Sequence, residues 1–144
     1  MKFLIILATI FCFQTVAKCE EKNYKPSELI SLLKIKNSKK FFSVDMNTKI
    51  LYDKKEIKYL IGLLGNDEPC KYVKHTRSST FPLTASKISI ESTYLLYGYL
   101  TNNYPVFESD EATLKEARKV VFIWLSSNFE ILEQTEQKSK SVSP

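Results

Sequence analysis

The stretch SIESTYLLYGYLTNN, residues 89–103, decides the fold because apolar side chains surround almost the whole of the helix that it predicts. Tyrosine and leucine occupy positions 94–97, 99 and 100 and leave hardly any polar face. A helix that is apolar nearly all round belongs in the middle of a domain. Gly98 interrupts it at a cost of about 1 kcal/mol relative to alanine. We therefore predict a central helix, against which a neighbouring segment packs closely at Gly98.

Two helices are predicted before this one. Pro26 suits a first helical position, and an apolar stripe follows it to about Lys36. Asp53 and Glu56 have the spacing of a capping box in front of apolar residues that recur every three or four positions. Gly65 then stands where a left-handed helix cap is expected.

The last helix is expected to begin after Ser109 or Asp110 and to fray past Glu133. Its inner stripe consists of Leu114, Ala117, Val121, Trp124 and Leu125. Alternating residues at 41–52 suggest a short β-hairpin, whereas residues 70–83 show no helical period and are interpreted as a loop. The predicted fold class is mainly α: a small single-domain bundle of about four helices, with a short β-hairpin near residues 41–52.

The first residues, MKFLIILATIFCFQTVA, have the pattern of a signal peptide. A lysine precedes an apolar run of about eleven residues, which as a helix would reach only about 16 Å and so is too short to span a bilayer. Small residues before Lys18 favour cleavage between Ala17 and Lys18. The predicted organisation is a signal peptide at 1–17, a single helical domain at 18–134 and a disordered polar tail at 135–144, and the expected location is secreted or periplasmic.

Cleavage would remove Cys12 and leave Cys19 and Cys70 in an oxidising compartment. Two cysteines in that setting favour one disulfide, here between Cys19 and Cys70. Three alternatives stay open: a free Cys19, an intermolecular bridge, and a lipidated Cys19. Lipidation is less favoured because Lys18 occupies the position where a small residue is required.

The formal net charge of +5 comes mostly from lysine, with Arg77 and Arg118 the only arginines. Nucleic-acid-binding proteins usually cluster arginine between aromatic residues, so nucleic acid is not an expected partner. None of the three glycines belongs to a phosphate-binding motif. The single histidine, His75, could act as the base of a serine hydrolase, but the sequence has no G-x-S-x-G motif. The spacings typical of metal-binding motifs are also absent. We therefore expect no catalytic residues, no metal and no cofactor.

The predicted loop contains the candidate binding residues. Its basic, hydroxyl-rich segment KYVKHTRSST offers Lys74, His75, Arg77 and Ser78 to an acidic partner or a carboxylate, with Arg77 as the best bidentate donor. The alternative is a solvated connector without a recognition role.

These features predict a small exported protein-binding module, such as an inhibitor or an immunity protein in the cell envelope or the medium, whose partner is another exported protein. The alternative is a carrier of a small apolar ligand or lipid, with Tyr94, Tyr97, Tyr99 and Trp124 around a pocket. A hydrolase with a carboxylate pair that no motif reveals is less favoured.

Overall fold

The computed structural model describes residues 22–34, 36, 39–45, 47–78, 85–104 and 110–140, with side chains as far as 128 in the last helix. The predicted signal peptide and Cys19 lie outside these residues, so the export hypothesis stays a prediction. No helix within the described ranges is both long and apolar enough to cross a membrane.

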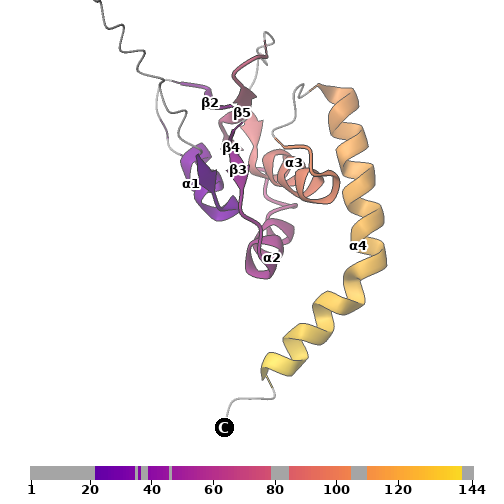
Figure 1. Cartoon of the computed structure of the whole chain (residues 1–144). Coiled ribbons are helices and arrows are strands. Elements are labelled where there is room, and N and C mark those ends of the chain that lie inside the picture. The colour runs from indigo at the N-terminus through magenta and orange to yellow at the C-terminus, as the bar shows by residue number, and fades with distance from the viewer. Residues whose placement is uncertain are drawn as a thin grey trace, which may run out of the picture.

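The described residues form a mixed α/β fold, and the prediction of a mainly α bundle is therefore wrong. The described ranges contain four helices: α1 (Pro26–Lys34), α2 (Lys54–Gly62), α3 (Ile88–Thr101) and α4 (Glu111–Lys140). Short strands lie between them (Figure 1). They are β1 (Asn23–Tyr24), β2 (Phe41–Val44), β3 (Lys49–Ile50), β4 (Pro69–Cys70), β5 (Tyr72–His75) and β6 (Ser86–Lys87).

The predicted hairpin at 41–52 does not form. Both of its segments are strands, but β2 pairs in parallel with β5, from Phe41↔Tyr72 to Val44↔His75, and β3 pairs in parallel with β1. A third pair, β4 with β6, is antiparallel. Part of the predicted loop is therefore β4 and β5. Alternation identified the strands at 41–52 but not their partners, because pairing between distant segments depends on how the intervening chain packs.

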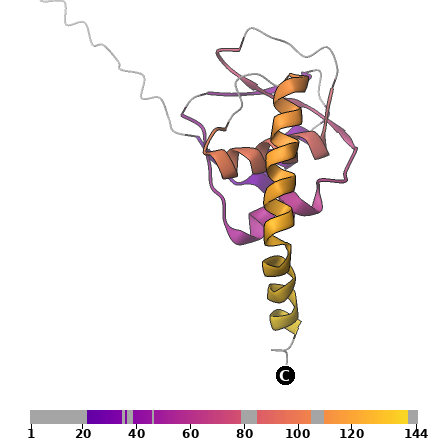
Figure 2. The same ribbon diagram turned by 90° about the vertical axis from the view of Figure 1, so that its right-hand side faces the viewer.

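The central position of α3 is confirmed. Figure 1 shows it between the strands and α4, and Figure 2 shows α4 crossing it and continuing below the rest of the chain. α3 contacts α1, α2 and α4. The core residues gather around it from all four helices: Leu29, Ile30, Leu33, Ile57, Leu60, Ile88, Leu95, Leu96 and Val121.

The helix limits agree with most of the predicted signals. Asp110 caps α4, since its side chain accepts a hydrogen bond of 2.7 Å from the Thr113 amide. α4 continues past Glu133 to Lys140. Gly65 is not a left-handed cap, because no described glycine has a positive φ; α2 ends instead at Leu63 with a right-handed φ of −95°.

Glu56 joins α1 to α2 and does not close the capping box that the sequence suggested. Asp53 accepts from the Glu56 amide at 2.9 Å, as expected. The Glu56 carboxylate, however, accepts from the amide (2.8 Å) and the hydroxyl (2.9 Å) of Ser27 in the first turn of α1. First-turn amides have no partner within their own helix. A buried carboxylate of α2 therefore caps α1.

Glu56→Ala should lower the free energy of unfolding by about 2 kcal/mol, because it leaves the partly buried Ser27 donors without an acceptor. Urea titration of the variant measures the change. Glu116→Ala, which removes an exposed acid from α4, should change stability by less than about 0.5 kcal/mol. Equal effects of the two substitutions would contradict the proposed link.

Candidate functional site

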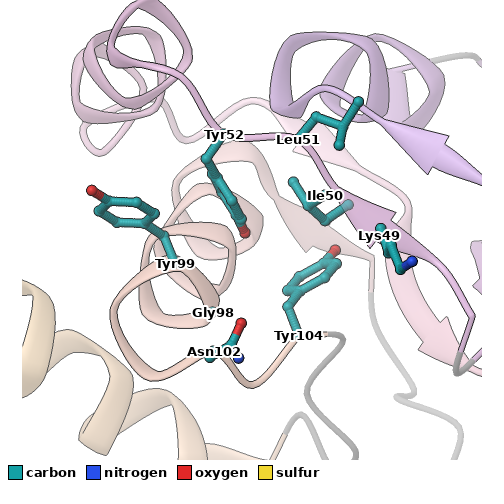
Figure 3. Close-up of a pocket in the computed structure, with 8 residues that line it drawn as sticks. All are labelled: Lys49, Ile50, Leu51, Tyr52, Gly98, Tyr99, Asn102 and Tyr104. Atoms are coloured by element: carbon teal, nitrogen blue, oxygen red, sulfur yellow. The ribbon is translucent and has the colours of Figure 1, made fainter.

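A cleft of about 700 Å³ lies between the segment that starts at β3 and the C-terminal end of α3 (Figure 3). We call it the tyrosine cleft. β3 and the residues after it contribute Lys49, Ile50, Leu51 and Tyr52. The end of α3 and the turn that follows contribute Gly98, Tyr99, Asn102 and Tyr104.

Aromatic rings form one side of the tyrosine cleft. The Tyr52 and Tyr99 ring centroids lie 5.3 Å apart, and Tyr99 meets Trp124 of α4 edge-on at 6.3 Å. The Tyr52 hydroxyl donates to the Leu95 carbonyl at 2.8 Å, which fixes that ring against α3. Tyr99 keeps 45% of its surface exposed. Tyr52 and Trp124 thus pack against the ring of Tyr99, and part of the Tyr99 side chain stays accessible to solvent.

Gly98 shapes the opposite side of the tyrosine cleft. A Cβ at this position would lie 2.5 Å from the Tyr104 Cβ, closer than packed carbon atoms approach. The close approach that the sequence predicted at Gly98 is therefore made by the side chain of Tyr104. The Tyr104 ring is half-buried, but its hydroxyl oxygen is inaccessible and has no hydrogen-bond partner among the described residues. Burial raises the pKa of Tyr104 well above 10, and the charge of Glu91 adds to the shift.

Gly98→Ala should destabilise the protein by about 2 kcal/mol, because the added methyl displaces Tyr104. Gly62→Ala is the matched control: Gly62 ends α2, and a Cβ there would meet nothing within 4 Å. It should raise the unfolding free energy by about 0.5 kcal/mol through better helix propensity. Thermal unfolding of both variants tests the pair, and two changes of the same sign would argue against the packing at Gly98.

Glu91, a buried residue of α3, is the described acid whose pKa is raised to about 7 by its surroundings. It is 3% exposed and accepts a long hydrogen bond of 3.4 Å from the Val73 amide. Burial raises its pKa from 4.5 to about 7, although hydrogen bonds from Ser86 and Val73 lower it. Its charge in turn raises the pKa of Cys70, Tyr94 and Tyr104. Glu91 is thus a candidate proton-exchanging group, on an element that also lines the cleft.

The unfolding free energy should fall as the pH rises from about 4.5 to 7, because the folded protein binds the Glu91 proton more tightly than the unfolded chain does. The loss is on the order of 3 kcal/mol. Glu91→Gln should flatten this part of the profile and be more stable than the parent at pH above 7. Denaturant titrations across pH measure it, with Glu116→Gln as an exposed control that should keep the parent profile.

The four candidate residues of the predicted loop are neighbours in sequence, but the structure points them in different directions. His75 ends β5 and is 6% exposed, and its Nδ1 accepts from the Arg77 amide at 3.1 Å. Lys74 lies over the Phe41 ring at 5.5 Å, Arg77 is exposed, and the Ser78 amide donates to the His75 carbonyl. His75 thus organises the turn, and Arg77 is the member that faces outward. The binding role of these residues stays a prediction.

Cys70 has a buried thiol whose pKa rises to about 12, chiefly through burial and then through Glu91 and Glu68. Such a thiol is a poor nucleophile. It is a free cysteine within the described residues, but its predicted partner, Cys19, lies outside them, so the disulfide stays a prediction.

A second exposed feature lies on α4. Phe122 is 70% and Ile123 55% exposed, and each follows a basic residue one helical turn earlier, Arg118 and Lys119 respectively. We call these four residues the α4 patch. Three of them, Arg118, Lys119 and Phe122, also line a groove of about 460 Å³ between α4, α3 and the turn after α2.

The helix turn after the α4 patch has an unusual hydrogen-bond pattern. Ser126, Ser127 and Asn128 donate side-chain hydrogen bonds of 2.8–3.0 Å to the carbonyls four residues earlier. Such bonds compete with the helix ladder and often bend a helix. Figure 1 shows α4 curving in its second half.

The pocket predicted around Tyr94, Tyr97, Tyr99 and Trp124 is only partly the one found. Tyr99 lines the tyrosine cleft and Trp124 supports it, whereas Tyr94 is buried, with its hydroxyl 3.5 Å from the Asp110 carbonyl. Tyr52 and Tyr104 were missed because they lie outside the central helix. No group of three potential metal ligands converges within the described ranges.

Comparison with protein families, with curated proteins and with solved structures finds no match for this chain. Its function must therefore be argued from its own surfaces.

Proposed function

We propose that this protein is a small exported binding module that contacts another protein through the α4 patch. The observation that carries the proposal is the exposure of Phe122 and Ile123, side by side on a helix that extends beyond the rest of the fold (Figure 2). Large apolar side chains presented together at a surface favour a contact surface. The predicted signal peptide supports a partner in the same exported compartment.

The charges of the α4 patch favour an acidic partner. Arg118 and Lys119 lie one turn before the two apolar residues, and the whole chain has a formal net charge of +5. A complementary surface would place apolar residues over Phe122 and Ile123 and carboxylates beside the two bases. A second copy of this chain is less suitable, because it would bring four like charges together.

The test begins with a stoichiometric partner isolated from the exported fraction of the producing cells, whose affinity for purified variants is then measured. Phe122→Ser should weaken binding by about tenfold or more, as expected when a central apolar anchor is lost. Lys119→Glu should slow association, and the difference should shrink at high salt. Leu51→Ser removes an exposed apolar side chain from the tyrosine cleft and should leave binding unchanged.

Three results would contradict the proposal. The first is a partner whose affinity depends on Leu51 and not on Phe122. The second is binding to anionic lipid vesicles with no protein partner, which would make the α4 patch a membrane contact. The third is a dimer in sedimentation that Phe122→Ser dissociates, which would assign the α4 patch to self-association.

A further inference from the structure

We propose that the tyrosine cleft binds a small, neutral, planar ring compound that carries a hydrogen-bonding group on its edge. The tyrosine cleft shares no residue with the α4 patch, so this activity is separate from the proposed protein contact. The volume of about 700 Å³ lies within the range of small-molecule pockets.

Tyr99 supplies the stacking surface. Its ring is held by Tyr52 at an interplanar angle of 53° and by Trp124 at 75°, yet nearly half of the residue faces solvent. Offset or tilted ring pairs at these separations are favourable beyond the area that they bury. A planar ring lying on Tyr99 would extend the existing row of aromatic contacts and cover its exposed surface.

Asn102 supplies the polar group. It has φ 55° and ψ 31° and is the only described non-glycine residue with a positive φ. Figure 3 shows its side-chain amide at the base of the tyrosine cleft, near Gly98 and Tyr104. An amide offers two donors and an acceptor, which match the edge of a ring that carries a carbonyl, a hydroxyl or a ring nitrogen.

The surrounding charges favour a neutral occupant. Lys49 lies at the β3 end of the tyrosine cleft, and the charge of Glu91 acts on Tyr104 at the other side. A cationic ligand would therefore meet the like charge of Lys49, and above pH 7, where Glu91 is ionised, an anionic ligand would meet that of Glu91. The mainly apolar wall of Ile50, Leu51 and Tyr52 suits an uncharged ring.

The experiment uses the purified full chain and prodan, a neutral naphthalene ketone whose emission shifts to the blue in apolar surroundings. Trp124 is the only tryptophan of the chain and contacts Tyr99, so energy transfer from Trp124 to prodan reports binding beside it. Titration should give a saturable blue shift and quenching of tryptophan emission.

Two substitutions test the assigned roles. Tyr99→Ser should weaken prodan binding by about tenfold, and Tyr99→Phe should largely keep it, because the ring and not the hydroxyl stacks. Asn102→Gly removes the amide but permits the left-handed backbone, so it should weaken binding by about threefold to tenfold. A melting temperature of Asn102→Gly at or above that of the parent would show that its fold is intact. Phe122→Ser should bind prodan like the parent.

Unchanged prodan affinity in both Tyr99→Ser and Asn102→Gly would overturn the proposal. So would tighter binding of the anionic probe anilinonaphthalene sulfonate that is lost in Lys49→Met, since the occupant would then be an anion. Loss of prodan binding in Phe122→Ser alone would assign the probe to the α4 patch. Because Phe122→Ser and Tyr99→Ser affect different surfaces, failure of this proposal is distinguishable from failure of the proposed protein contact.

Discussion

The burial of α3 on nearly all sides constrains the rest of the structure. Leu95 and Leu96 are fully buried, and three helices contact the element that carries them. A helix without a polar face must be covered completely, and the short strand pairs and the long α4 complete that cover. At Gly98 the side chain of Tyr104 packs so closely against α3 that a Cβ at position 98 would clash with it. The shape of the tyrosine cleft follows from this contact.

Two carboxylates lie in the interior with different consequences. Glu56 receives two short hydrogen bonds from Ser27 and thereby connects α1 to α2. Glu91 accepts hydrogen bonds from Ser86 and, at 3.4 Å, from Val73, yet its burial is deep enough to hold its pKa at about 7. A buried charge stabilises a fold only when its hydrogen bonds replace the lost hydration. The first group therefore supports the structure, whereas the second makes it sensitive to pH next to a candidate binding site.

The two exposed features have different chemistry. The tyrosine cleft is concave and aromatic, which suits a small molecule, while the α4 patch combines exposed apolar with basic side chains, which suits an acidic protein surface. Trp124, which follows the α4 patch directly in the sequence, meets Tyr99 of the tyrosine cleft edge-on and so lies close to both features. Trp124 is thus a natural reporter for both proposals.

The sequence by itself determined the helices and some of their caps. The apolar run at 89–103, the Asp53 cap and the Asp110 cap are local signals, since helix periodicity and capping involve residues within a few positions of one another. Tyr99 was also predicted to line a pocket, whereas the exposure of Phe122 was not predicted.

Only the tertiary structure decided which strand pairs with which, that Glu56 caps α1, that His75 turns inward, and that Tyr52 and Tyr104 line one cleft with Tyr99. Apart from the turn at His75, these contacts join segments that lie far apart in the sequence. No periodic sequence pattern links such distant segments. Their geometry is fixed by the packing of the whole domain around α3, and a local pattern cannot encode it.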